Sequence, residues 1–273
     1  MTYNTLITAG TLFQNIDQPN WVIIDCRFSL ADTEAGGKAF LKGHIPNAFY
    51  AHLDKDLSSR VIPGKTGRHP LPDIDVLADK FSMWGIDSSS QVVVYDDKGG
   101  AIASRLWWLL NWLGHENVAV LDGGWQFWEK EKLPVSNQVS KSSRKKFIPK
   151  KQAHFTVSRR EMGIQTEKTP PVIIDSRAHE RYLGRIEPID PIAGHIPGAI
   201  NLPFMENLDA EGKFLSKEAL QSRFLSIKAG NNPPVFYCGS GVTACHNILA
   251  FKYAGYGQAI LYPGSWSEWI TAF

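Results

Sequence analysis

The chain has 273 residues, a formal net charge of +2 and 43% hydrophobic residues. This length suits two domains better than one, since single hydrophobic cores stop growing at roughly 250 to 300 residues. The nearly balanced charge gives no reason to expect nucleic-acid or membrane binding, and no apolar run approaches the ~18 residues that a membrane-spanning helix needs.

Four short sequence motifs occur in both halves of the chain, in the same order. The four matched pairs are residues 22–27 (VIIDCR) with 172–177 (VIIDSR), 43–48 (GHIPNA) with 194–199 (GHIPGA), 92–96 (VVVYD) with 235–238 (VFYC), and 121–128 (LDGGWQFW) with 261–269 (LYPGSWSEW). An offset of about 140 to 150 residues indicates a duplicated domain, because solenoid repeats have periods of only ~20 to 50 residues.

Each half alternates short β-rich apolar runs with amphipathic stretches. Two of these stretches, residues 103–113 and 244–253, have the apolar spacing of helices. The alternation predicts an α/β fold in which each domain is a mainly parallel sheet flanked by helices. The paired Asp-x-Arg sequences that end the first apolar run of each half predict an ion pair or a cap that both domains share.

The residues between the halves, 130–151, are rich in Lys, Ser, Pro and Gln and lack periodicity. Such composition is typical of a linker, and its basic run at 141–146 is better explained by solvation than by a nucleic-acid site. We therefore predict domains at residues 1–135 and 154–273, joined by a linker at 136–153.

The stretch that follows the apolar run 235–237 carries the candidate chemistry. The predicted strand stops at Cys238, and a helix is predicted from Ala244. The loop between them curls its backbone N–H groups inward, which makes an anion-binding nest at a helix N-terminus. Such a nest favours a thiolate, and a thiolate is a nucleophile. The residues of this amide cradle are Gly239, Ser240, Gly241, Val242 and Thr243.

The sequence Cys238-Gly-Ser-Gly-Val-Thr-Ala244 resembles the active-site loop of the rhodanese superfamily, in the form that 3-mercaptopyruvate sulfurtransferases carry. The resemblance covers nearly the whole chain and implies two tandem rhodanese-like domains. Only the second domain of such proteins keeps the cysteine. Because Asp96 stands where the second half has Cys238, the first half is predicted to be non-catalytic.

The resemblance implies an enzyme that moves a sulfane sulfur from 3-mercaptopyruvate, through a persulfide on Cys238, to cyanide or to a thiol acceptor such as thioredoxin, releasing pyruvate. Members that prefer thiosulfate carry cationic side chains in this loop, whereas Gly239 and Ser240 are neutral, which favours mercaptopyruvate. Thiosulfate remains an alternative donor, and a persulfide carrier or sensor that serves one partner protein remains an alternative function. A phosphatase would need an arginine within a longer loop, which this sequence lacks.

The resemblance also implies roles for residues outside the loop. Arg181 matches a position that binds the donor's carboxylate, while the second arginine expected around residues 187–190 is absent. Arg185 and Arg68 are the candidates to replace it. His44 matches a histidine that assists Ser240 in proton transfer, although His195 repeats the same motif and so favours a turn-stabilising role equally.

The resemblance further implies a carboxylate that pairs with the motif histidine of the first half, and Asp32 lies near its position. The three cysteines, Cys26, Cys238 and Cys245, show no metal-ligand or disulfide spacing, so we expect neither metal nor cofactor. Free thiols favour a reducing compartment, and residues 1–12 lack the features of a signal peptide. We therefore expect a cytoplasmic monomer.

Overall fold

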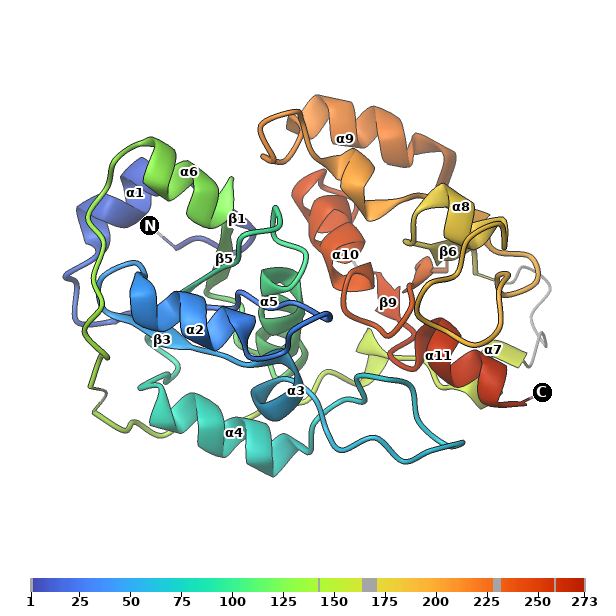
Figure 1. Ribbon diagram of the computed structural model, residues 1–273, viewed down its shortest axis with the longest axis horizontal. Coiled ribbons are helices and arrows are strands. Elements are labelled where there is room, and N and C mark those ends of the chain that lie inside the picture. The colour runs from blue at the N-terminus through green and yellow to red at the C-terminus, as the bar shows by residue number, and fades with distance from the viewer. Residues whose placement is uncertain (1, 142, 164–170, 228–231, 258, 273) are drawn as a thin grey trace. The chain divides into compact units, whose positions relative to one another are not determined.

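The computed structural model describes residues 2–141, 143–163, 171–227, 232–257 and 259–272 (Figure 1). The chain divides into two compact units. Unit 1 comprises Met1–Ser59, Leu71–Gln152 and Glu211–Lys213, and unit 2 comprises Arg60–Pro70, Ala153–Ala210 and Phe214–Phe273. Each unit thus includes a short segment that the sequence places in the other half. Within the described ranges, none of the helices combines the length and the apolar character needed to cross a membrane.

Unit 1 is built on a five-stranded sheet in the order β1-β5-β4-β2-β3, in which all paired strands are parallel. The strands are β1 (Leu6–Ile7), β2 (Trp21–Asp25), β3 (Ala48–Tyr50), β4 (Gln91–Tyr95) and β5 (Val118–Leu121). The helices are α1 (Ala9–Asn15), α2 (Ala35–Lys42), α3 (Leu53–Asp56), α4 (Ile74–Met83), α5 (Ala103–Trp112) and α6 (Gly124–Lys130). This architecture confirms the predicted parallel α/β fold.

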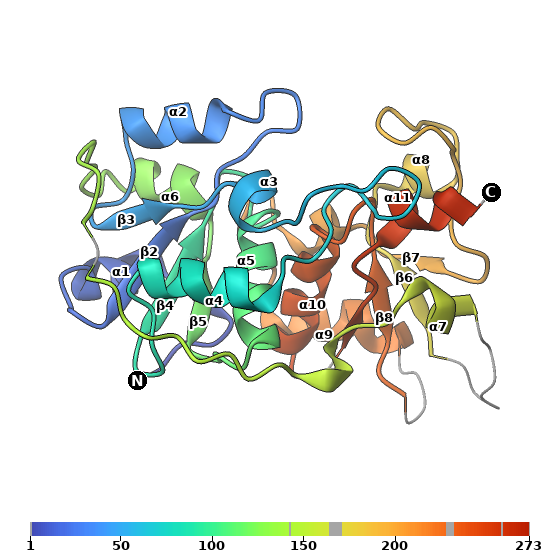
Figure 2. The same ribbon diagram turned by 90° about the horizontal axis from the view of Figure 1, so that it is seen from below.

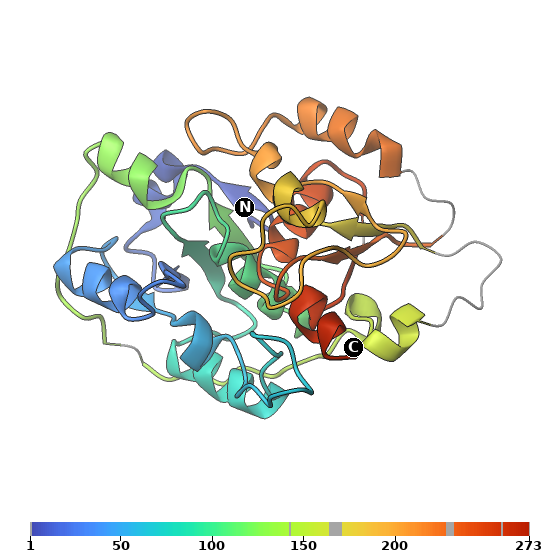
Figure 3. The same cartoon turned by 45° about the vertical axis from the view of Figure 1, so that its right-hand side comes forward.

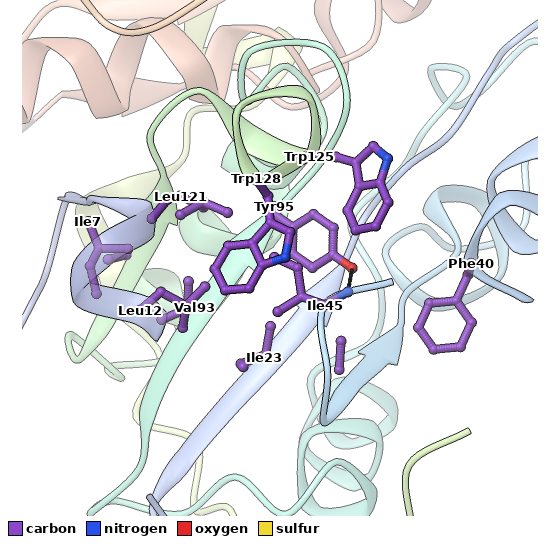
Figure 4. Close-up of a cluster of buried hydrophobic side chains, with 13 residues drawn as sticks. Ile7, Leu12, Ile23, Phe40, Ile45, Val93, Tyr95, Leu121, Trp125 and Trp128 are labelled. Atoms are coloured by element: carbon purple, nitrogen blue, oxygen red, sulfur yellow. Dashed lines mark hydrogen bonds between the residues drawn. The ribbon is translucent and has the colours of Figure 1, made fainter. Parts of the chain in front are cut away.

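Helices cover both faces of this sheet, with α2 and α6 on one side and α4 and α5 on the other (Figure 2). Alternate strand residues point to opposite faces, so Ile23, Val93 and Tyr95 share the face that packs against Phe40 of α2 and Trp128 of α6 (Figure 4). The Tyr95 hydroxyl accepts a hydrogen bond from the Ile45 backbone N–H at 3.2 Å. Both faces of the sheet are therefore buried, as a parallel sheet requires.

Unit 2 repeats this plan with a four-stranded parallel sheet in the order β7-β6-β8-β9. The strands are β6 (Ile173–Asp175), β7 (Ile200–Asn201), β8 (Val235–Tyr237) and β9 (Ile260–Leu261). This order is that of β3-β2-β4-β5 in unit 1, so the sequence repeat is also a structural repeat.

The helices of unit 2 are α7 (Arg159–Gly163), α8 (His179–Tyr182), α9 (Lys217–Phe224), α10 (Ala244–Tyr253) and α11 (Ser265–Trp269), with 3-10 turns at Ala153–Phe155, Phe204–Asn207, Leu225–Ile227 and Ile270–Ala272. Met162 of α7 and Trp266 of α11 pack against Val235 and Tyr237 of β8 on one face. Helix α9 lies on the opposite side of the sheet from α11 (Figure 3).

A buried ion pair ends the corresponding strand of each unit. Asp25, the last residue of β2, lies 2.6 Å from Arg27, and Asp175, the last residue of β6, lies 2.6 Å from Arg177. Each guanidinium group also lies over a tryptophan ring of the fourth repeated motif, at 4.4 Å in unit 1 and 5.0 Å in unit 2. The predicted Asp-x-Arg ion pairs are therefore present, and they tie two of the repeated motifs together.

The segment predicted as a linker, residues 136–153, lies against unit 1 as far as Gln152. Ser136 and His44 exchange two backbone hydrogen bonds of 2.8 and 2.9 Å, and the Lys150 N–H donates to the Leu113 carbonyl at 2.8 Å. Phe147 in this segment is buried. The segment is thus attached mainly by its backbone, which no side-chain periodicity reveals, while residue 142 lies outside the described residues.

Candidate active site

Cys238 lies where β8 ends, at the carboxyl end of a strand that has parallel neighbours on both sides. Open α/β sheets bind ligands at this end of their strands. The thiol is 2% exposed, and the backbone N–H of Gly241 donates to its Sγ at 3.2 Å. A backbone N–H that donates to sulfur favours the thiolate form. The Gly241 contact is therefore the kind of hydrogen bond that the predicted amide cradle requires.

The shape of the loop depends on Gly241. Its φ of +75° lies in the left-handed region, and a Cβ built on it would lie 2.3 Å from the Pro263 carbonyl oxygen. Only glycine avoids both the backbone strain and the clash. The loop can therefore turn its N–H groups toward Cys238 while the segment before α11 packs directly behind it.

The first turn of α11 holds the start of the loop in place. The Trp266 and Ser267 N–H groups donate to the carbonyls of Cys238 and Gly239 at 3.0 and 2.9 Å. The Ser265 hydroxyl accepts from the Cys238 N–H at 3.1 Å. Because the backbone around the cysteine is fixed from behind, its side chain has little freedom to move.

Ser240 forms a hydrogen bond with a histidine that the sequence analysis did not select. The Ser240 Oγ and the His69 Nδ1 lie 2.7 Å apart, and the two residues are 6% and 3% exposed. His69 belongs to the segment Arg60–Pro70 of unit 2, which is also held by a 3.0 Å hydrogen bond from the Arg68 N–H to the Ser267 hydroxyl. Its position beside Arg68, a predicted site residue, was the available signal.

His44, the histidine predicted to assist Ser240, is engaged inside unit 1. Its Nδ1 lies 2.6 Å from the Phe40 carbonyl oxygen, its Nε2 lies 3.1 Å from the Gln138 carbonyl oxygen, and its ring stacks on Phe40. His195 repeats this arrangement, because its Nδ1 lies 2.8 Å from the Tyr182 carbonyl oxygen and its ring stacks on Tyr182. Each motif histidine thus binds the carbonyl of a residue in the helix that precedes it.

Two of the three predicted substrate-binding arginines meet at the loop. The Arg68 Nη2 and the Arg181 Nη1 lie 3.1 and 3.5 Å from the point that a Cβ on Gly239 would occupy. Asp190 accepts hydrogen bonds from both, at 2.6 Å from the Arg68 Nη1 and 3.0 Å from the Arg181 Nη2. Guanidinium N–H groups therefore stand beside the residue that follows Cys238, where they can bind an anionic donor.

The third arginine, Arg185, is exposed and pairs with the exposed Glu180 at 3.4 Å. Asp32 is also exposed, and its nearest cation is Lys38 at 3.2 Å. Neither residue contacts Cys238, Ser240 or His69 through any described hydrogen bond or ion pair. The structure therefore places Arg68 and Arg181, but not Arg185 or Asp32, in the arrangement around the loop.

Glu187 connects this arrangement to the buried ion pair of unit 2. It lies 2.6 Å from Arg181 and 3.3 Å from Arg177. Burial acts to raise the pKa of Glu187, but hydrogen bonds from Arg181 and from the Asp190 backbone outweigh it and hold the pKa below its ordinary value of 4.5. Glu187 is thus held as a carboxylate.

The last two cradle residues complete the turn into α10. The Val242 and Thr243 carbonyls accept from the N–H groups of Cys245 and His246 at 3.1 and 3.2 Å. Val242 is buried. The backbone is therefore already helical in its hydrogen bonding where the loop ends, which orients the helix N-terminus.

The corresponding loop of unit 1 is occupied by its own side chain. The buried Asp96 carboxylate accepts four backbone hydrogen bonds of 2.7 to 2.9 Å, from Lys98, Gly100, Ile102 and Ala103. A carboxylate cannot form a persulfide as a cysteine thiolate does. In this loop the carboxylate also occupies the N–H groups that would otherwise form an anion-binding nest. Among the described residues, no group of three or more His, Cys, Asp and Glu side chains is placed to hold a metal ion.

Comparison with known proteins gives matches along nearly the whole chain. The family described as "Rhodanese-like domain" matches residues 8–131 and 161–272. A Pseudomonas aeruginosa protein named "Probable 3-mercaptopyruvate sulfurtransferase" is 44% identical over 274 residues, covering 99% of this chain and 96% of the relative. The "Thiosulfate sulfurtransferase" of Bos taurus is 31% identical over 278 residues, covering 98% and 92%. The solved structure "3-mercaptopyruvate sulfurtransferase from Leishmania major" matches with a TM-score of 0.86 at 31% identity, covering 99% of this chain and 75% of that one.

Proposed function

Because this chain belongs to the rhodanese family and is a sulfurtransferase, we propose that it takes a sulfur atom from 3-mercaptopyruvate onto Cys238 and passes it to a thiol or to cyanide. The observation that carries the proposal is the placement of the Cys238 sulfur. It accepts the Gly241 N–H, and two guanidinium groups lie against the next residue. This arrangement combines a nucleophile with a carboxylate-binding site.

In the first step the Cys238 thiolate attacks the sulfur atom of 3-mercaptopyruvate. A sulfur–sulfur bond forms while the carbon–sulfur bond breaks, and its electron pair goes to the carbon to give the enolate of pyruvate. The proton of the donor thiol ends on that carbon, so the products are a persulfide on Cys238 and pyruvate. Arg181 and Arg68 hold the donor's carboxylate, which fixes the attacked sulfur near the cysteine.

His69 and Ser240 provide a route for that proton. Their 2.7 Å hydrogen bond joins an imidazole, whose ordinary range of protonation spans neutral pH, to a hydroxyl two residues after the nucleophile. Ser240 can hydrogen-bond the donor's carbonyl oxygen and pass the proton to or from the imidazole. His69 therefore takes the acid–base role that the sequence analysis assigned to His44.

In the second step the outer sulfur of the persulfide is attacked by the acceptor. A thiol acceptor leaves as a persulfide, cyanide leaves as thiocyanate, and the Cys238 thiolate is restored. We propose a protein thiol such as that of thioredoxin as the acceptor. Because one site serves both half-reactions, the kinetics should be ping-pong.

Thiosulfate is the second candidate donor, since a thiosulfate sulfurtransferase is among the relatives. The composition of the cysteine loop makes thiosulfate the less favoured donor. Gly239 and Ser240 supply a backbone N–H and a hydroxyl but no positive charge, and thiosulfate is a dianion. Mercaptopyruvate, a monoanion with a carbonyl group, fits these neutral donors better.

The deciding experiment compares initial rates with 3-mercaptopyruvate and with thiosulfate, using cyanide as the common acceptor. We expect kcat/KM to be at least tenfold higher for mercaptopyruvate, about 1.4 kcal/mol in transition-state binding. The variant Cys238→Ser should fold and lose transfer from both donors. Cys26→Ser is its matched control, because the Cys26 thiol contacts the Ile24 carbonyl of unit 1 and the second half has Ser176 at the equivalent position. A higher kcat/KM with thiosulfate, or transfer by Cys238→Ser, would refute the proposal.

A further inference from the structure

Asp190 lies between the two arginines that face the cysteine loop. Its carboxylate is 3% exposed and binds Arg68 and Arg181 through separate oxygens, Oδ1 and Oδ2. The guanidinium groups use one terminal nitrogen each for this contact, the Arg68 Nη1 and the Arg181 Nη2. The other terminal nitrogens, the Arg68 Nη2 and the Arg181 Nη1, lie 3.1 and 3.5 Å from the position of a Cβ on Gly239, and the Arg181 Nη2 is also 3.5 Å from it. Asp190 therefore holds two like charges together and turns their remaining donors toward the loop.

Asp190 also belongs to a continuous network of charged side chains in unit 2. In order of contact, the members are Arg68, Asp190, Arg181, Glu187, Arg177 and Asp175. Three are cationic and three are acidic, so the network has no formal net charge. The site thus offers guanidinium hydrogen bonds to an anion without offering an excess of positive charge.

We propose that Asp190 determines the donor preference of this sulfurtransferase by cancelling one of the two positive charges that face the donor. The inference rests on the proposed function, because it concerns which donor the same cysteine accepts. Because the network is neutral, every negative charge that a donor brings is uncompensated. A dianion therefore adds twice the uncompensated charge of a monoanion, and a partly buried charge without a partner is costly.

The direct test replaces Asp190 by an uncharged residue of the same shape. In Asp190→Asn the network carries one excess positive charge, so kcat/KM for thiosulfate relative to that for 3-mercaptopyruvate should rise by about tenfold or more. Asp190→Glu keeps the charge and should keep the wild-type ratio within about threefold. A ratio unchanged in Asp190→Asn, or raised equally in Asp190→Glu, would overturn the inference.

Glu180→Gln is the matched control for overall charge. It removes one negative charge from α8, the helix that carries Arg181, but Glu180 is exposed and pairs only with Arg185 among the ion pairs described. We expect the donor ratio of this variant to equal that of the wild type. A rise as large as that of Asp190→Asn would show that net protein charge, rather than the Asp190 contact, sets the preference, and would overturn the inference.

Anion binding gives a test that needs no turnover. Sulfate and methanesulfonate are both tetrahedral at sulfur and similar in size, but sulfate carries two negative charges and methanesulfonate carries one. Calorimetric titration of the wild-type protein should show methanesulfonate binding at least as tightly as sulfate, with the order reversed in Asp190→Asn. Tenfold tighter sulfate binding by the wild type would overturn the inference. A protein that turned over neither donor would refute the proposed function, yet these titrations would still decide the role of Asp190.

Discussion

At the scale of single residues, proton transfer and turn stabilisation, both predicted for His44, belong to two different histidines, His69 and His44. His69 lies 2.7 Å from Ser240 in the loop of the nucleophile. His44 has each ring nitrogen within 3.1 Å of a backbone carbonyl oxygen in unit 1. The first histidine can therefore move a proton at the reacting groups, while the second one stabilises a turn and the segment that follows α6.

The two histidine-to-alanine variants should fail in different ways. His69→Ala should lower kcat with 3-mercaptopyruvate by about 100-fold or more and flatten its dependence on pH, because the acid–base group is lost. His44→Ala should retain a kcat near that of the wild type and lose about 1 kcal/mol or more of stability. Rate–pH profiles and urea unfolding measure these effects, and an equal loss of kcat in both variants would contradict the assignment.

Arg181 and Arg185 form a second informative pair. Arg181→Ala should raise the KM for 3-mercaptopyruvate by about tenfold or more with a smaller change in kcat, since the donor's carboxylate loses a guanidinium partner. Arg185→Ala removes an equal charge from an exposed side chain and should leave both constants unchanged. Steady-state kinetics distinguishes them. If Arg181→Ala lowered kcat and left KM unchanged, its role in carboxylate binding would be wrong.

The sequence identified the residues whose chemistry is local and failed on those that depend on tertiary position. Cys238 and its loop stand together in the sequence, and the strand before and the helix after them form as predicted. His69 is separated from Ser240 by 171 residues. Its contact depends on segment 60–70 belonging to unit 2, and the only signal for this in the sequence is the neighbouring Arg68, a predicted site residue.

At the scale of elements, the turn from β8 into α10 depends on two glycines with different requirements. A Cβ on Gly241 would meet the Pro263 backbone at 2.3 Å, in a left-handed conformation. A Cβ on Gly239 would meet only the ends of arginine side chains, at 3.1 Å or more. The first contact cannot relax without moving the backbone, whereas the second can relax by moving a side chain.

Gly241→Ala should therefore cost about 1 to 3 kcal/mol or more of stability and displace the N–H that binds the Cys238 sulfur. We expect sulfur transfer to fall steeply in that variant. Gly239→Ala should remain as stable as the wild type and should mainly raise the KM for the donor. Thermal unfolding combined with donor kinetics tests the pair. Equal stability of the two variants would contradict the geometry.

Element order was also predictable, because each half states the same strand and turn motifs and their buried faces are apolar. The attachment of residues 136–152 to unit 1 was not. Its contacts are largely backbone hydrogen bonds, such as that from Lys150 to Leu113, and backbone groups are the same in every sequence. Only one strongly apolar side chain, Phe147, marks where this segment is buried.

At the scale of the whole molecule, the ion network makes stability depend on pH. The pKa of Glu187 is lower in the folded protein than its ordinary value of 4.5, so the unfolded chain binds the proton more readily. The stabilisation from this group is complete above about pH 4.5 and is lost as the pH falls through the folded pKa. We expect Glu187→Gln to unfold with a weaker dependence on pH in this acidic range.

Chemical unfolding of the wild type and of Glu187→Gln at several pH values below 5 measures this dependence. Glu180→Gln is the control, because Glu180 is exposed and lies outside the network. An identical acid dependence in wild type and Glu187→Gln would mean that Arg181 and Arg177 do not hold this carboxylate ionised.

The Asp96 side chain that fills the nest of unit 1 bears on how many sulfur atoms each chain can store. Because the Asp96 carboxylate accepts four N–H groups there, and because the Cys238 sulfur accepts the Gly241 N–H beside two arginines, we expect Cys238 alone to store sulfur. A fully loaded preparation should then release one equivalent of thiocyanate per chain in a single burst with cyanide. The amount of thiocyanate released in that burst equals the number of active chains. The burst can therefore be used to titrate the active sites of a preparation.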